Sequence, residues 1–346
     1  MAQMRRTITL SMAVLSGILT AGPEVRAASQ TVTFPSEQLD GRTKTLTIRG
    51  RLSKPKGNGP FPAVVLLPNC GGPATYEFAQ FWPAYLNQLG YVTLNVDPFA
   101  PRKARRCSKK FRPSMESVAQ DAFGALSYLA TLPGVDARKV AVIGSSLGAH
   151  VIIAFAGKGH TTKTGLTFKA AVSLYPVSCR RLVVSAAMIP TLVIQGDRER
   201  GVRSCRRYAA RAVLRAKILE NTYHGFDQPS ATRRRNGRLR TDIGGNKRLY
   251  SRSATRTAQA LVKDFLTLRL TASEETPRPD RNSAPLGNVG GRNPYRAVRR
   301  RDSDGDGRVS AAEWERSPRI FSRIDANEDG YLTAQEFFDH WQRRLR

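Results

Sequence analysis

One serine of this chain lies in a context that makes a nucleophile. The segment GSSLG (144–148) follows an apolar run, KVAVIG (139–144), and opens a stretch with helical character. A nucleophile at such a strand-to-helix turn stands exposed above the sheet, and the residues two before and two after it must be small. Ser146 has glycine at both places, whereas Ser145 is flanked there by larger side chains. The spacing therefore predicts Ser146 as the nucleophile.

A serine hydroxyl becomes nucleophilic when a base removes its proton, and the base needs a carboxylate to hold its tautomer. One common chain order is serine, acid, histidine. Asp197, at the end of an apolar run, and His224, in a loop before the last predicted helix of this region, fit that order. Glu199 and Asp227 are fallback acids, although Asp227 is very close to the histidine in sequence. Three histidines fit the role less well: His150, His160 and His340.

These residues need a scaffold that brings the ends of several strands together. Apolar or alternating runs that predict strands are 45–52, 62–68, 91–97, 139–144, 169–176 and 188–197. Helical stretches lie between them or follow them, at 75–89, 116–132, from about 147, and at 254–270. This alternation predicts an α/β fold with a mainly parallel sheet, helices on both faces and a site at the carboxyl ends of the strands.

Four motifs of the predicted sheet region stand out: VVLLPNCGG (64–72), IGSSLGA (143–149), IQGD (194–197) and HGFD (224–227). On these motifs, residues 30–271 resemble the dienelactone hydrolase family of the α/β-hydrolase fold. The resemblance implies ester hydrolysis by a triad of Ser146, Asp197 and His224. It also implies an oxyanion hole made by the backbone N–H groups of Leu147 and Cys70. The chain departs from the founding enzymes in having serine where they use cysteine, which favours general ester hydrolysis over hydrolysis of dienelactone itself.

The charge of the chain is unevenly distributed. Its 346 residues include 56 Lys and Arg against 27 Asp and Glu, a net charge of +29, and residues 28–271 hold 39 of the basic and 13 of the acidic residues. Such a surface attracts an anionic substrate or an anionic cell-envelope surface, but it can equally be a solvated basic face without a partner. No nucleic-acid-binding module or transmembrane run is present in the sequence. The basic clusters are 101–113, 198–217 and 233–240.

The first 27 residues have the pattern of an export signal. Arg5 and Arg6 precede an apolar stretch, and Val25-Arg26-Ala27 predicts cleavage after Ala27 or Ala28. An uncleaved membrane anchor is the alternative. Export to the periplasm of a bacterial cell, or beyond it, predicts two disulfides, for which four cysteines allow three connectivities. We favour Cys70–Cys107 and Cys179–Cys205, since each would join loops at the same end of the sheet.

The C-terminal part carries a second chemistry. Residues 272–293, rich in Pro, Gly, Ser and Asn, predict a linker to a domain at 294–346. Two loops in that domain have oxygen ligands at positions 1, 3, 5, 7 and 12 and glycine at position 6, as in a paired EF-hand domain, which implies two calcium ions. Val309 and Leu332, at position 8 of each loop, are expected to pair. The predicted ligands are Asp302, Asp304, Asp306, Arg308 and Glu313 in the first loop and Asp325, Asn327, Asp329, Tyr331 and Glu336 in the second.

The sequence thus favours an exported serine esterase with a calcium-binding C-terminal domain. The main alternative is a binding protein for calcium and polyanions whose hydrolase fold has lost activity. A peptidase is the third hypothesis, because related peptidases also carry HGF-type histidine loops.

Overall fold

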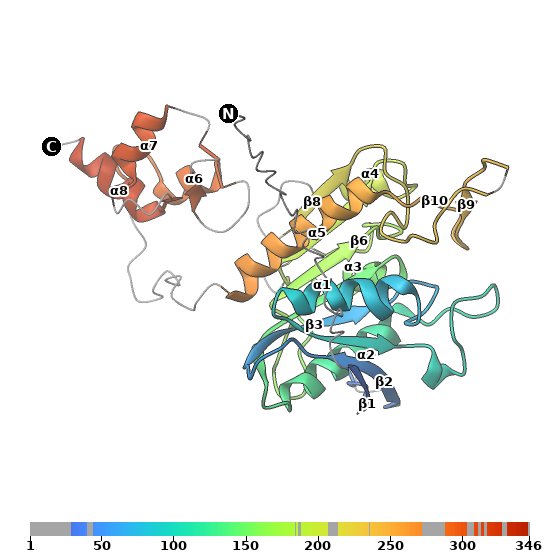
Figure 1. Cartoon of the computed structure of the whole chain (residues 1–346). Coiled ribbons are helices and arrows are strands. Elements are labelled where there is room, and N and C mark those ends of the chain that lie inside the picture. Colours follow the sequence, from blue (N-terminus) through green and yellow to red (C-terminus); the bar gives the residue numbers. More distant parts are fainter. Residues whose placement is uncertain are drawn as a thin grey trace, which may run out of the picture.

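The computed structural model describes most of the chain (Figure 1). The residues described are 29–39, 44–183, 185, 188–206, 214–234, 236–271, 288–302, 308–310, 313–314, 317–326 and 331–344. The predicted signal segment, 1–27, lies outside them, as does most of the predicted linker. No helix in the described part of the chain is long and apolar enough to cross a membrane.

An eight-stranded sheet forms the main scaffold, in the order β1-β2-β4-β3-β5-β6-β7-β8. Only β2 runs antiparallel to its two neighbours, and every other pairing in the sheet is parallel. The carboxyl ends of the parallel strands therefore meet at one edge, where the predicted catalytic side chains follow them. The strands are β1 (Ser29–Pro35), β2 (Thr47–Ser53), β3 (Phe61–Leu67), β4 (Val92–Asp97), β5 (Val135–Ser145), β6 (Ala170–Leu174), β7 (Thr191–Gly196) and β8 (Leu214–Leu219).

Helices cover both faces of this sheet (Figure 1). One apolar core packs α2 and α3 against it, and the other packs α1 and α5. Ser114 and Ser251 cap α2 and α5, each accepting a hydrogen bond from a backbone N–H of the first turn. The helical segments are η1 (Glu77–Phe81), α1 (Trp82–Gln88), η2 (Ala100–Arg102), α2 (Met115–Ala130), α3 (Leu147–Phe155), α4 (Val202–Arg206), α5 (Arg252–Leu266) and η3 (Thr267–Thr271).

The structure confirms the predicted fold class and adds elements that the sequence analysis did not include, three of which concern the sheet and the candidate site. These are the edge strand β1, the strand β8 and a small hairpin of β9 (Arg240–Thr241) and β10 (Lys247–Arg248). The segment of β8, LRAKIL, carries two basic residues among its apolar ones, so it lacks the continuous apolar run of a central strand. The hairpin lies between the loop of His224 and α5, and it adds residues to the candidate site.

The C-terminal residues form a unit with its own apolar core. Val309 and Leu332 pair between the two loop regions, as expected, and both are fully buried. Trp314, Phe321 and Phe337 pack around them. The elements are α6 (Pro294–Arg299), β11 (Val309–Ser310), α7 (Pro318–Ile324), β12 (Tyr331–Leu332) and α8 (Ala334–Arg343).

Candidate active site

Ser146 lies at the turn between β5 and α3, with a backbone φ of 49° and ψ of −101°. A Cβ atom on Gly144 would lie 2.4 Å from the carbonyl carbon of Gly148, and one on Gly148 would lie 2.2 Å from the carbonyl oxygen of Leu67. Both approaches are far shorter than van der Waals contact, so only glycine fits either position. The turn places Ser146 in the wall of a pocket, whereas Ser145 ends β5 and is fully buried.

His224 contacts the serine from the loop that follows β8. Its Nε2 lies 2.9 Å from Oγ of Ser146, and its Nδ1 lies 2.7 Å from Oε2 of Glu199. The other carboxylate oxygen of Glu199 accepts the backbone N–H of Gly196 at 2.9 Å. A carboxylate at Nδ1 favours the tautomer that carries its proton there, which leaves Nε2 free to accept the serine hydroxyl.

Glu199, and not Asp197 as the sequence analysis favoured, is the carboxylate at the histidine. The backbone N–H of Asp197 still donates to Leu219 at 2.9 Å, so this residue continues the pairing of β7 with β8. Its carboxylate accepts the backbone N–H of Thr222 at 3.0 Å instead of meeting His224. Only after the turn that follows β7 does a side chain reach the imidazole. The structure therefore brings Glu199, one of the two fallback residues, to the imidazole in place of Asp197.

Asp227, the other fallback acid, lies in the histidine loop and bonds to neighbouring elements instead of to His224. Its two carboxylate oxygens accept hydrogen bonds from Tyr175 Oη at 2.6 Å and from Trp82 Nε1 at 2.9 Å. The ring of Tyr175 packs edge-on against the imidazole of His224, with the ring centres 4.9 Å apart. Burial raises the pKa of Asp227 despite these hydrogen bonds. This carboxylate therefore fixes the loop that carries the base.

The two residues expected to form the oxyanion hole, Leu147 and Cys70, both line the pocket of the nucleophile. Within the described residues, neither backbone N–H donates to another group. Asn69 shapes the loop of Cys70: its Oδ1 accepts the N–H of Gly71 at 2.6 Å, and its Nδ2 donates to Glu77 at 2.8 Å. Glu77 is buried in the pocket wall, and burial raises the pKa of its carboxyl group. The arrangement leaves two N–H donors beside the serine.

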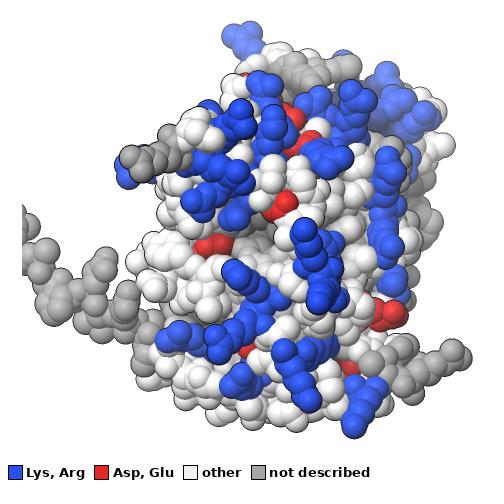
Figure 2. Space-filling model, turned by 90° about the vertical axis from the view of Figure 1, so that its right-hand side faces the viewer, with Lys and Arg blue, Asp and Glu red and all other residues white. Residues whose placement is uncertain are grey.

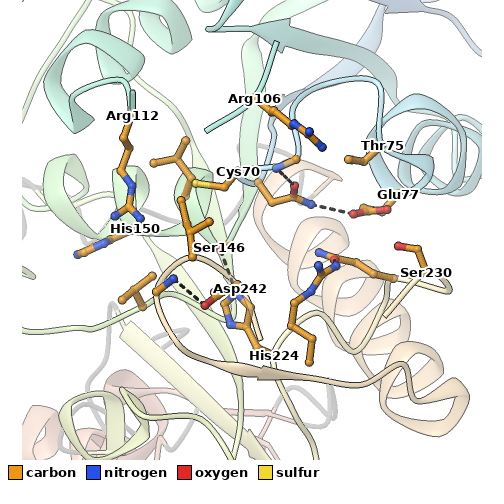
Figure 3. A pocket seen from close by; sticks show the side chains of 18 residues that line it. Cys70, Thr75, Glu77, Arg106, Arg112, Ser146, His150, His224, Ser230 and Asp242 are labelled. Carbon is orange, nitrogen blue, oxygen red and sulfur yellow. Dashed lines mark hydrogen bonds and ion pairs between the residues drawn. The ribbon is translucent and has the colours of Figure 1, made fainter. Parts of the chain in front are cut away.

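The pocket around Ser146 has a volume of about 270 Å³ and a mixed polar lining. Figure 3 shows Arg112 and His150 on one side of the serine and Arg106, Thr75, Glu77 and Ser230 on the other. The β9–β10 hairpin contributes Asp242, whose Oδ2 lies 3.3 Å from Nε2 of His224. Figure 2 views the molecule from the side of this hairpin, and Lys and Arg are spread widely over that face. The basic cluster 101–113 thus borders the pocket through two of its arginines.

Comparison with known proteins gives the family of the chain. The family model of the dienelactone hydrolase family matches residues 48–268. The chain belongs to the dienelactone hydrolase family. EF-hand models match residues 301–316 and 319–337 of the same hydrolase. A search of curated proteins finds no match.

Solved structures resemble the hydrolase over about seven-tenths of its length. The protein named m3DLH is 20% identical, with a TM-score of 0.52 over 70% of this chain and 99% of its own. A dienelactone hydrolase from Anabaena variabilis is 18% identical, with a TM-score of 0.49 over 70% of this chain and 99% of its own. An esterase from Pyrobaculum calidifontis is 17% identical, with a TM-score of 0.45 over 69% of this chain and 82% of its own. The likeness to the first of these shows a shared fold.

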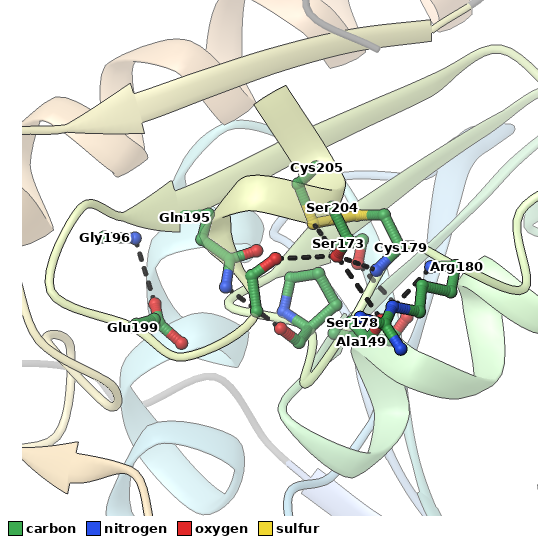
Figure 4. Close-up of a disulfide and its surroundings, with 12 residues drawn as sticks. Ala149, Ser173, Ser178, Cys179, Arg180, Gln195, Gly196, Glu199, Ser204 and Cys205 are labelled. Atoms are coloured by element: carbon green, nitrogen blue, oxygen red, sulfur yellow. Dashed lines mark hydrogen bonds between the residues drawn. A yellow bond between two sulfur atoms is a disulfide. The ribbon is translucent and has the colours of Figure 1, made fainter. Parts of the chain in front are cut away.

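Both favoured disulfides are present in the hydrolase. Cys70–Cys107 joins the loop expected to form part of the oxyanion hole to the basic cluster 101–113, and the N–H of Cys107 also donates to the carbonyl of Cys70 at 2.9 Å. Cys179–Cys205 joins the loop after β6 to α4, where Ser204 accepts the N–H of Cys179 at 3.0 Å (Figure 4). Each disulfide therefore lies at the carboxyl edge of the sheet, as expected.

The structure describes six of the ten predicted calcium ligands. Asp304, Asp306, Asn327 and Asp329 lie outside the described residues. In the second loop, the N–H of Ala326, the residue after the first ligand position, donates to Glu336, the last ligand position, at 3.1 Å. Asp325 and Glu336 are both buried. The described ligand positions are Asp302, Arg308, Glu313, Asp325, Tyr331 and Glu336.

The pocket residues that the sequence analysis did not single out include three with charged side chains. Asp242 and Arg248 lie on the β9–β10 hairpin, whose short strands have no apolar periodicity to reveal them. Glu77 lies inside a predicted helix, and nothing in its spacing distinguishes it from a solvent-facing residue. The one signal in the sequence is that Glu77 follows closely after the motif at 64–72, which contains Asn69, its hydrogen-bond partner in the structure.

Proposed function

We propose that this protein is an exported serine hydrolase of carboxylic esters that uses Ser146, His224 and Glu199. The observation that carries the proposal is the pair of hydrogen bonds at His224, 2.9 Å to the serine and 2.7 Å to the glutamate. A base so placed can remove the hydroxyl proton as the oxygen attacks, and the carboxylate stabilises the imidazolium that forms. The left-handed turn presents the serine to the pocket.

The reaction proceeds in two stages. In the first, Ser146 Oγ attacks the acyl carbon, His224 Nε2 takes the hydroxyl proton, and the N–H groups of Leu147 and Cys70 bind the oxyanion. The protonated imidazole then gives that proton to the departing alcohol, and an acyl-enzyme remains. In the second stage, His224 takes a proton from water, which attacks the acyl carbon. The imidazolium then returns that proton to Oγ of Ser146 as the acyl–oxygen bond breaks, and the carboxylic acid leaves. The substrate is a small or polymeric ester, and the basic surface suits an anionic one or an anionic cell-envelope surface.

Calcium is the ion proposed for the two EF-hand loops, with a structural role. Carboxylate and backbone carbonyl oxygens are the ligands that Ca²⁺ takes in such loops. The described residues fit that ion: Asp325 and Glu336 are both buried, the N–H next to Asp325 donates to Glu336, and the pairing of β11 with β12 brings the two loops side by side. Bound there, the ion would neutralise the buried carboxylates. Each loop would hold one ion through the five ligands predicted for it from the sequence.

Export is proposed from the N-terminal pattern together with cysteine use. In the described part of the chain, every cysteine is paired in a disulfide. Disulfides persist in oxidising compartments, so the periplasm or the outside of a bacterial cell suits this protein.

The experiment that tests the enzymatic proposal is hydrolysis of p-nitrophenyl acetate by the wild type, by Ser146→Ala and by Ser145→Ala. Loss of the nucleophile removes attack and proton transfer together, so we expect Ser146→Ala to lower kcat by about a thousandfold or more. Ser145→Ala is the matched control, since it removes a buried hydroxyl that does not face the pocket. An inactive wild type, or an active Ser146→Ala variant, contradicts the proposal.

A further inference from the structure

A second cavity opens beside the pocket of Ser146. Its volume is about 570 Å³, twice that of the first pocket. The two share three lining residues, Arg112, Leu147 and His150. Because Leu147 also belongs to the nucleophile turn, the second cavity begins next to the proposed oxyanion hole. It does not include Ser146 or His224 in its lining. We call it the α2–α3 pocket, after the two helices that supply half of its lining residues.

The inner wall of the α2–α3 pocket is largely apolar. Met115 and Ala119 come from α2, and Ala154 and Phe155 come from α3. Leu39, in the segment after β1, completes the wall. Binding against such a wall removes the hydrocarbon of a ligand from water, which favours binding. The wall therefore suits an alkyl or alkenyl chain.

The rim of this pocket is cationic. Arg112, Lys158 and Arg181 line it and are exposed, against one carboxylate, Glu116. Within the described residues, none of the three basic side chains is in an ion pair. Desolvation, followed by the charges of Arg181 and Arg112, lowers the pKa of His150 between the two pockets. Unpaired cations at the end of an apolar wall suit a ligand with a negative group at the end of its chain.

The chemistry of the reaction decides which half of an ester reaches this pocket. The departing oxygen must receive its proton from Nε2 of His224, so the alcohol half stays in the pocket that His224 lines. The acyl carbon is bonded to Ser146 and its oxygen faces the N–H of Leu147. The chain beyond that carbon can therefore pass Leu147 into the α2–α3 pocket.

We propose that the α2–α3 pocket is an acyl-binding subsite for esters whose apolar acyl chain ends in an anionic group. The inference rests on the proposed esterase function and names the acyl half of its substrate. The apolar chain would lie along Met115, Ala154 and Phe155, and its terminal anion would reach Arg181.

The test compares three p-nitrophenyl esters: the acetate, the nonanoate below its micelle concentration, and the mono-ester of azelaic acid, whose chain has the same length as nonanoate but ends in a carboxylate. We expect kcat/KM for the azelate ester to exceed that for the nonanoate by about fivefold at low salt, the scale of one exposed ion pair. The excess shrinks as ionic strength rises. An equal kcat/KM for the two long esters overturns the anionic part of the proposal.

Two variants locate the subsite. Arg181→Gln removes the azelate preference, whereas Lys56→Gln, which loses the same charge in the turn before β3 at the opposite edge of the sheet, retains it. Ala154→Phe fills the apolar wall and lowers kcat/KM for both long esters relative to acetate. An equal effect of Arg181→Gln and Lys56→Gln, or an unchanged ratio of long to short esters in Ala154→Phe, overturns the proposal. Failure of the wild type to cleave even the acetate contradicts the esterase function instead.

Discussion

The Oε2 atom of Glu199 lies 2.7 Å from Nδ1 of His224, and both side chains are almost fully buried. A charge-assisted hydrogen bond is strongest where water is excluded, and here it fixes both the tautomer and the orientation of the ring. Asp197, two residues earlier, has a partly exposed carboxylate that contacts the backbone of Thr222. Glu199 can therefore orient the imidazole of His224, whereas Asp197 contacts the backbone of Thr222 instead.

We predict that Glu199→Gln lowers kcat for p-nitrophenyl acetate by about 10²–10⁴-fold, because an amide neither fixes the productive tautomer nor stabilises the imidazolium. Asp197→Asn is the matched control, because it replaces a carboxylate by an amide two residues away. We expect kcat to fall less than about fivefold in this variant. Steady-state kinetics on both variants checks this. A larger loss in Asp197→Asn than in Glu199→Gln would reverse the assignment of the acid.

The second prediction separates the two disulfides by their effect on catalysis. Their loops of 37 and 26 residues make their chain-entropy contributions similar, about 3–4 kcal/mol each. Only Cys70–Cys107 braces an N–H of the proposed oxyanion hole. Replacing both of its cysteines by serine should lower kcat by about 10-fold or more beyond any change in Cys179→Ser/Cys205→Ser. Chemical denaturation and kcat, measured on folded protein, distinguish the two effects, and equal kcat values would contradict the bracing role.

The third prediction concerns Asp121, a buried residue of α2 that makes two hydrogen bonds with the Arg102 guanidinium, at 2.8 and 3.1 Å. Burial raises the pKa of Asp121 from 3.8 to about 6, although Arg102 acts in the opposite direction. A folded-state pKa above the unfolded one means that protonation favours the fold. The stability from this group is therefore full below pH 3.8 and lost as pH rises through 6.

Urea unfolding between pH 4 and 7 tests the direction of this pH dependence of stability. The free energy of unfolding of the wild type should fall, relative to Asp121→Asn, by about 2–3 kcal/mol across this range, since a shift of one pKa unit corresponds to about 1.4 kcal/mol. The variant is the control for all other titrating groups, which it shares with the wild type. A difference between the two proteins that is independent of pH would mean that Asp121 stays ionised in the folded state.

Much of the fold and part of the site could be predicted from the sequence. The strands at the centre of a parallel sheet are buried on both faces, so β3 and β7 appear as continuous apolar runs. The nucleophile turn can also be predicted from the sequence, because the close approaches at Gly144 and Gly148 restrict those positions to glycine. Both signals are local, because each depends on the side chains of a few consecutive residues and on the space available to them.

The choice of acid could not be predicted in the same way. Asp197 and Glu199 both follow β7 within three residues, and only the turn after the strand decides which carboxylate meets His224. Asp242 reaches the same imidazole from a hairpin whose position depends on packing far from it in sequence. The chain order of serine, acid and histidine limits the candidates, but the backbone path selects among them.

The last prediction tests the proposed calcium sites through Glu336, which occupies position 12 of the second loop. Glu336 also caps α8, where it accepts hydrogen bonds from the N–H and the hydroxyl of Thr333, and glutamine can serve in the same capping box. Glu336→Gln should therefore keep the helix start while weakening calcium binding. Asp339→Asn, in the same helix, removes the same charge outside the loop and is the control.

We expect calcium at ten times the dissociation constant to stabilise the C-terminal unit by about 1.4 kcal/mol for each site, with millimolar concentrations the relevant range for extracellular modules. Two of the three tryptophans of the chain, Trp314 and Trp341, pack in or against the core of this unit, so their fluorescence reports its unfolding. Calcium should raise the unfolding midpoint in the wild type and in Asp339→Asn, and less in Glu336→Gln. The same midpoint with calcium and with a chelator would contradict the structural role, because an ion that binds only the folded state must stabilise it.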